Sequence, residues 1–205
     1  YKQLKENNMK KVKTTNKVMA ALLVLATTVT FTSCTSNGNT SKLEAKVDSL
    51  QAELKKFTDE RTITEQRLLS FDSLDYDFYS NQQWDKFNHS HADNIKVYYP
   101  DGHVTEGLYP DHIDMLTPMF AFAPDTKIEE HPVKFGSGDW TAVIGVMEGT
   151  FSKPMPIGNG KTIPPTGKKF KLSMTTIGHW KDGKMIEEYL FWDNQSFMKQ
   201  IGLAQ

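Results

Sequence analysis

The alternation of apolar and polar positions in the last third of the chain predicts a β-hairpin. In "FKLSMTTIGHW" the residues Phe170, Leu172 and Met174 are apolar, and the side chains between them are polar. Because side chains alternate across a strand, these even-numbered residues are expected to face the core. Residues 181–183, Lys-Asp-Gly, form a hairpin turn, and "KMIEEYLFWD" is the return strand.

The return strand is apolar on both faces. Leu190 and Trp192 share one face with Glu188, whereas Tyr189 and Phe191 lie on the other. Such a strand fits a sheet that is covered by helices on one side and by a partner sheet on the other.

The remaining elements place helices before most of the sheet. Strand composition recurs in residues 94–100, 126–136 and 140–151. Helical spacing precedes and follows a break at Ser80–Asn81, returns after Pro110, and closes the chain in residues 194–202. This order predicts an α+β domain with its helices on one face of a mostly antiparallel sheet.

A polar segment before this domain carries a seam of apolar residues spaced by four and three. The seam consists of Leu43, Val47, Leu50, Leu54 and Phe57. About two heptads is short for a stable coiled coil. The pattern favours a helical stalk or a weak dimer seam, and a helix whose stripe packs on its own domain is the alternative.

The N-terminal pattern predicts an exported protein. We expect the natural start at Met9, followed by a basic stretch and the apolar "VMAALLVLATTVTFT". The chain's only cysteine, Cys34, comes directly after Thr32 and Ser33. This arrangement resembles a bacterial lipoprotein signal, in which the cysteine is lipidated, although Phe31 departs from the usual leucine. An ordinary signal peptide followed by an incidental buried cysteine is the alternative.

Charge argues against nucleic acid as a partner. The whole chain has a formal net charge of −1. Residues 1–33 contain six Lys and one Glu, so the rest has 18 basic and 24 acidic side chains and a net charge of −6. A basic stripe of the kind that binds nucleic acid is missing from the sequence.

The C-terminal motif is similar to a known family. "PPTGKKFKLSMTTIGHWKDGKMIEEYLFWDNQSFMKQIG" resembles the C-terminal half of a SnoaL-like polyketide cyclase (ester cyclase) domain, of the nuclear transport factor 2-like superfamily. "NIKVYYPDGHVTEG" resembles the family's earlier strand and turn, so the likeness covers about 75–202. It implies a cone in which a curved sheet wraps around helices, with a pocket at the wide end and frequent dimerisation through the sheet.

The resemblance also gives expectations about chemistry. The family's cyclases carry an H-x-D pair on the last strand, and those positions are Glu188 and Leu190 here. Leucine cannot transfer a proton, so the cyclase mechanism is not expected. Asp193 is expected to cap the final helix. Glu188 in an apolar pocket is the candidate general acid or base. Alternatively, it hydrogen-bonds a hydroxyl of Thr176 or Tyr98 and is only structural.

The expected ligand-binding residues surround Glu188 and are mainly apolar or aromatic. They are Tyr98, Trp140, Met174, Thr176, Leu190 and Trp192. No cofactor and no metal site is predicted. His89 and His91 in "HSHAD" are candidate ligands by residue type, but side chains two apart on a helix diverge.

The sequence thus predicts three parts: residues 1–33 as upstream residues and signal, residues 34–61 as a lipid-anchored linker and stalk, and residues 62–205 as the SnoaL-like domain. The expected function is binding of a small apolar ligand or a partner, without cyclase chemistry, on a bacterial membrane and most simply the outer one. A homodimer through the sheet or the stalk is a further expectation. An enzyme with a rearranged acid–base site centred on Glu188 is the alternative.

Overall fold

A long helix opens the part of the chain that the computed structural model describes, residues 37–204. Helix α2 (Asn37–Ser73) continues into a π-helical turn, η1 (Leu74–Tyr79), and a 3-10 turn, η2 (Trp84–His89), follows. The break after Tyr79 lies at the predicted place. The boundary between two units of the chain falls after Leu50, and both it and the predicted domain start at residue 62 lie inside α2. The signal segment and Cys34 lie outside the described residues.

A seven-stranded sheet forms the second layer within residues 37–204. Its order is β2-β1-β9-β8-β5-β3, with β4 also paired to β5, and β1–β9 is its parallel pair. The strands are β1 (His91–Tyr98), β2 (Val104–Glu106), β3 (Lys127–Ile128), β4 (Val133–Ser137), β5 (Trp140–Thr150), β8 (Lys169–Lys181) and β9 (Lys184–Trp192). A separate short pair is β6 (Met155–Pro156) with β7 (Thr162–Ile163).

The predicted hairpin is the β8–β9 pair. Phe170 and Leu172 are buried, which confirms the inward face expected for the even-numbered residues. In the register of this pair Thr176 lies opposite Leu190, and Glu188 lies opposite Gly178. Glu188 and Leu190 are both buried, so they stand on the same inner face.

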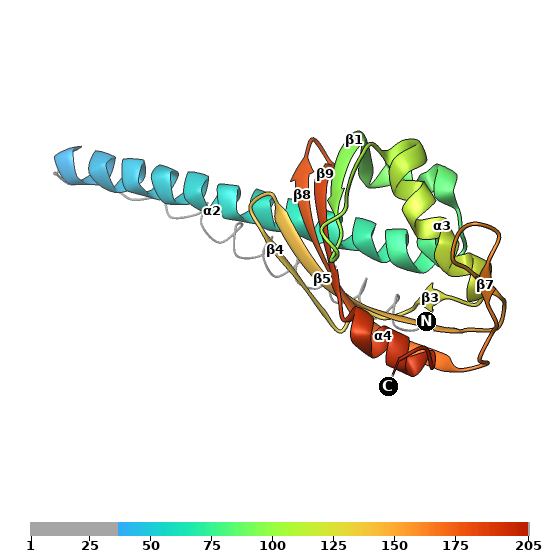
Figure 1. Cartoon of the computed structure of the whole chain (residues 1–205). Helices are drawn as coiled ribbons and strands as arrows, with labels where there is room; N and C mark the ends of the chain where they lie inside the picture. Colours follow the sequence, from blue (N-terminus) through green and yellow to red (C-terminus); the bar gives the residue numbers. More distant parts are fainter. Residues whose placement is uncertain (1–36, 205) are drawn as a thin grey trace. The chain divides into compact units, whose positions relative to one another are not determined.

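The helices of the unit that begins at Gln51 cover that inner face. Figure 1 shows the last turns of α2 and helix α3 (Ile113–Phe122) on the same side of the sheet. Phe71 is fully buried and packs its ring edge-on against Trp180, with centroids 6.0 Å apart. Arg67 ties the same helix to the β4–β5 turn, donating to the Gly138 carbonyl at 2.6 Å and pairing with Asp139 at 2.9 Å.

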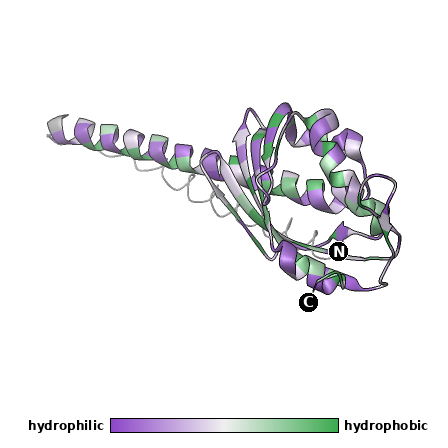
Figure 2. Ribbon diagram, in the orientation of Figure 1, coloured by the Kyte–Doolittle hydropathy of each residue, from purple (hydrophilic) through white to green (hydrophobic). Residues whose placement is uncertain are grey.

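The remaining helices frame the open end of the sheet. A π-helical turn, η3 (Leu108–His112), leads into α3, and α4 (Asn194–Gln200) closes the chain. Hydrophobic residues recur along α3 and the strands among hydrophilic ones, whereas hydrophilic residues dominate the early turns of α2 (Figure 2). The domain is therefore of the predicted α+β class, with helices packed on a curved, mostly antiparallel sheet.

The apolar seam in α2 is exposed. Leu54 and Phe57 expose 57% and 67% of their surface, so these two side chains are not packed on the domain. Within residues 37–204, no helix combines the length and the apolar character that a membrane crossing requires.

Candidate functional site

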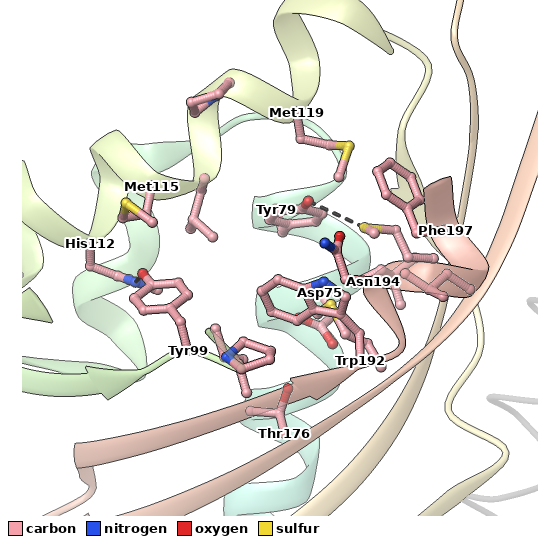
Figure 3. Close-up of a pocket in the computed structure, with 18 of the residues that line it drawn as sticks. Asp75, Tyr79, Tyr99, His112, Met115, Met119, Thr176, Trp192, Asn194 and Phe197 are labelled. Carbon is pink, nitrogen blue, oxygen red and sulfur yellow. Dashed lines mark hydrogen bonds between the residues drawn. The ribbon is translucent and has the colours of Figure 1, made fainter. Parts of the chain in front are cut away.

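A cavity of about 630 Å³ lies between the helices and the inner face of the sheet. Figure 3 shows Tyr99, His112 and Met115 on one side of this space, and Trp192, Asn194 and Phe197 on the other. The apolar lining residues are Leu74, Phe87, Pro100, Met115, Leu116, Pro118, Met119, Phe122, Ile128, Met147, Met155, Leu172, Met174, Leu190, Trp192, Phe197 and Met198. The polar ones are Asp75, Tyr79, His91, Tyr99, Asp101, His112, Thr176, Glu188 and Asn194.

Three polar side chains converge at one end of the cavity. Nε2 of His91 lies 3.7 Å from Oε2 of Glu188, and Nε2 of His112 lies 3.6 Å from the same oxygen. The parallel pairing of β1 with β9 brings His91 and Glu188 into one neighbourhood, and η3 supplies His112. All three side chains are at least nine-tenths buried, so the cavity has one strongly polar end in apolar surroundings.

The far nitrogen of each histidine ring is held by a neighbour. Nδ1 of His91 lies 3.1 Å from the carbonyl oxygen of Phe87 and 2.9 Å from Oγ of Ser90. Because a carbonyl oxygen only accepts, Nδ1 of His91 carries the hydrogen, and Nε2 of the neutral ring is a bare acceptor. Nδ1 of His112 is 2.8 Å from the hydroxyl of Tyr99. Both imidazole rings therefore present Nε2 toward Glu188.

Burial and charge set the protonation of this cluster in opposite directions. Burial disfavours the charged carboxylate of Glu188, yet the positive charge that His91 and His112 carry when protonated outweighs it and lowers the pKa of Glu188 below its ordinary value. Burial lowers the pKa of His112 to about 4, so this ring is neutral at neutral pH. Burial also raises the pKa of the Tyr99 hydroxyl, which stays protonated.

A second charged cluster adjoins the cavity through Asp75. Nε2 of His131 is 2.8 Å from Oδ2 of Asp75, and Nδ1 of the same ring is 2.9 Å from Oδ1 of Asp72. Lys134 pairs with Asp72 from the adjacent strand β4. Burial raises the pKa of Asp75, whereas the pKa of His131 is raised because its two carboxylate partners outweigh its burial.

Five of the residues expected at the pocket from sequence line the cavity: Met174, Thr176, Glu188, Leu190 and Trp192. Tyr98 and Trp140 do not. Tyr98 stacks on Tyr189 at 4.5 Å, and Trp140 stacks on His179 at 4.2 Å. Tyr98 follows the inward-facing Val97 on its strand, and strand alternation therefore turns it to the outer face. The suggested hydrogen bond from a Thr176 or Tyr98 hydroxyl to Glu188 is not formed.

The histidines of the cluster were not found by sequence reasoning. His89 ends η2 and lies against the ring of Phe78. His91, however, opens strand β1 rather than continuing a helix, and it meets His112 from more than twenty residues away. The alternation of Ile95 and Val97 with polar residues predicts the strand, but a register shift between His91 and Lys96 separates His91 from that pattern.

Asp193 has the structural role that was predicted for it. Its Oδ1 accepts a hydrogen bond from the backbone N–H of Ser196 at 2.9 Å, which caps helix α4. This later aspartate of the motif is therefore committed to the fold and does not belong to the polar end of the cavity.

Known protein families and solved structures contain the same architecture. A family model described as SnoaL-like polyketide cyclase matches residues 73–201, and the chain belongs to that family. No curated protein matches the sequence significantly. Among solved structures, a protein of Jannaschia sp. assigned as a SnoaL-like polyketide cyclase is 19% identical, with a TM-score of 0.59 over 70% of this chain and 96% of that one.

Two further solved structures share the fold at low identity. IdmH of Streptomyces antibioticus, assigned as a polyketide cyclase, is 21% identical, with a TM-score of 0.56 over 67% of this chain and 99% of its own. A Catenulispora acidiphila protein of ketosteroid isomerase-like fold, solved in complex with trimethylamine, is 12% identical, with a TM-score of 0.53 over 69% and 95% of the two chains. The fold is thus the nuclear transport factor 2-like cone.

Proposed function

We propose that this domain binds a small, mainly apolar molecule in its cone cavity and holds one polar group of that molecule at the end formed by Glu188, His91 and His112. The observation that carries the proposal is the lining: a mainly apolar space of about 630 Å³ in which the buried side chains of Glu188, His91 and His112 converge. Ligand sites typically combine an apolar wall with a few convergent polar groups that fix orientation.

The family's cyclase chemistry is not part of the proposal. The position that carries the acid–base aspartate in the resemblance is Leu190, which is 6% exposed and lines the cavity. A hydrocarbon side chain has no proton to give or accept, so ring closure by the family's usual route lacks its acid–base group.

An enzyme of the SnoaL-like class is the second candidate, and one observation favours it. Glu188 faces two histidines at 3.6–3.7 Å instead of a structural hydroxyl, which gives the cavity groups that can hold and move a proton. Turnover of a cyclase substrate by the wild-type chain, abolished in Glu188→Gln, would establish this candidate and overturn the binding-only proposal.

The binding proposal is tested with a neutral apolar fluorescent probe, N-phenyl-1-naphthylamine. Leu190→Trp places a larger ring in the cavity, and we expect it to weaken probe binding at least about tenfold. Phe191→Trp is the matched control, because the neighbouring side chain is 51% exposed on the opposite face. Equal binding by wild type and both variants, or no binding by wild type, would contradict the proposal.

We also propose that lipid on Cys34 tethers the domain to a bacterial membrane, most simply the outer membrane. The support is the signal-like segment before a sole cysteine. Metabolic labelling with a fatty acid analogue should mark the wild type and leave Cys34→Ser unlabelled. Equal labelling of the two proteins would remove the proposal.

A further inference from the structure

Three potential metal ligands meet at the polar end of the cavity. One ligand atom from each of His91, His112 and Glu188 lies within 4.8 Å of the other two. They come from three separate segments: the start of β1, the end of η3 and the middle of β9. Tertiary packing, and not local sequence, therefore brings them together.

Two of these atoms have unsatisfied hydrogen-bonding capacity. In the described part of the chain, Nε2 of His91 and Oε2 of Glu188 are buried and have no hydrogen-bond partner. The distances of 3.6 and 3.7 Å are too long for hydrogen bonds between the ring nitrogens and the carboxylate. Leaving buried polar atoms unpaired is costly, so such atoms point to a group that completes them.

In both rings Nδ1, the nitrogen that faces away from Glu188, has a polar neighbour that fixes the ring orientation. Metal-bound histidines usually donate the other ring N–H to a fixed acceptor, which sets the tautomer and the ring orientation. Nδ1 of His91 faces the Phe87 carbonyl, and Nδ1 of His112 faces the Tyr99 hydroxyl. Nε2 of His91 is consequently free of hydrogen in the neutral ring and can act as a ligand.

The geometry is close to that of a three-ligand metal centre. Two ligands at about 2.0–2.2 Å from a tetrahedral Zn²⁺ lie roughly 3.4 Å apart. The two distances to Glu188 exceed this by a few tenths of an ångström, and each of the three ligand atoms lies within 4.8 Å of the other two. Two imidazoles with one carboxylate form the donor set of catalytic zinc and non-haem iron sites, in which further positions stay open.

We propose that His91, His112 and Glu188 bind one divalent first-row transition-metal ion, with its open coordination positions directed into the cavity. The site shares the cavity of the proposed function, but it does not depend on which apolar molecule binds there. A metal at this end would offer a ligating position to a carbonyl, carboxylate or hydroxyl group of that molecule.

The test uses untagged protein treated with a chelator and dialysed. Titration with Zn²⁺ by calorimetry should give one ion per chain, and Co²⁺ should produce visible d–d absorption bands. Glu188→Gln and His112→Asn are expected to lower the affinity by at least about tenfold. Glu187→Gln and His179→Asn are the matched controls, since these side chains form a Glu–His pair at 2.8 Å that is about 30% exposed and does not line the cavity. They should bind the metal as wild type does.

Wild-type protein provides an independent readout if a buried variant fails to fold. In ¹⁵N-histidine NMR, Zn²⁺ should shift Nε2 of His91 and His112 and leave the other four histidines unchanged. No binding at millimolar Zn²⁺, or binding that persists in Glu188→Gln and His112→Asn, would overturn the proposal. Probe binding in the presence of chelator tests the cavity separately, so the two proposals fail independently.

Discussion

At the residue scale, the molecule separates its buried charges into two clusters with different chemistry. Glu188 faces two histidines that lack hydrogen bonds to it, whereas His131 makes short contacts to both Asp72 and Asp75. The first cluster contains buried polar atoms without hydrogen-bond partners beside the cavity. In the second cluster both nitrogens of His131 are paired with carboxylates. The second cluster is therefore expected to act on stability, and the first on binding.

The His131 cluster gives a pH-dependent stability. The pKa of His131 is raised above 6.5 because Asp72 and Asp75 outweigh burial, and the pKa of Asp72 is lowered below 3.8. A raised histidine pKa stabilises the fold below pH 6.5 and loses this effect as the pH rises through the folded-state value. We expect His131→Gln to cost about 1–3 kcal/mol more at about pH 5.5 than at about pH 9.

Urea unfolding of wild type and His131→Gln at the two pH values measures this difference. His103→Gln is the control, because its side chain lies in an exposed turn. A loss in His131→Gln that is the same at both pH values would show that the ion pairs do not stabilise the fold.

Some of the residues that line the cavity could be predicted from the sequence, and the others could not for a physical reason. Glu188 and Leu190 could be placed in the cavity because strand alternation is local information. His112 could not, because its position depends on how η3 packs over β1 and β9, which no short pattern encodes. Trp140 was misplaced because composition shows that a residue is aromatic but not which face of its strand it occupies.

At the element scale, the β8–β9 hairpin and the helix that follows it are the most locally determined part of the fold. A Lys-Asp-Gly turn joins the strands, and Asp182 and Gly183 adopt the positive φ angles that such a turn requires. The helix α4 begins where Asp193 caps it. These signals are short-range, and the corresponding boundaries were predicted within about two residues.

We expect Asp193→Ala to lower the free energy of unfolding by about 1 kcal/mol, because the Ser196 N–H loses its acceptor. The melting temperature should fall by about 2–4 °C. Asp193→Asn should remain close to wild type, since asparagine caps equally well. An unchanged melting temperature in Asp193→Ala would indicate that solvent satisfies the helix end without the cap.

At the scale of the whole molecule, the long helix α2 contributes to the core through its later turns. The core contacts of this helix come from Arg67, Leu68 and Phe71, whereas the earlier seam is exposed. The sequence pattern identified the seam but placed the domain start at residue 62, because composition changes there while the helix continues. Whether the seam or the sheet forms a homodimer stays a prediction.

A chain that starts at Thr62 is expected to unfold cooperatively, with a melting temperature close to that of the longer chain, because the removed residues 43–57 of the seam are exposed. A chain that starts at Ser73 should be strongly destabilised, since it lacks Phe71 and the Arg67 contacts. Circular dichroism melts compare the two. Loss of the cooperative transition in the chain from Thr62 would mean that the earlier turns belong to the core.

The central claim is that the cavity takes up an apolar molecule, and methionine methyl NMR tests it most directly. Of the chain's nine methionines, six line the cavity: Met115, Met119, Met147, Met155, Met174 and Met198. Met185 is fully buried but is not part of the lining, and it serves as an internal control. With ¹³C-methyl methionine, saturating N-phenyl-1-naphthylamine should shift the six cavity signals and leave Met185 in place. Unchanged cavity signals, or a uniform change that includes Met185, would contradict the account.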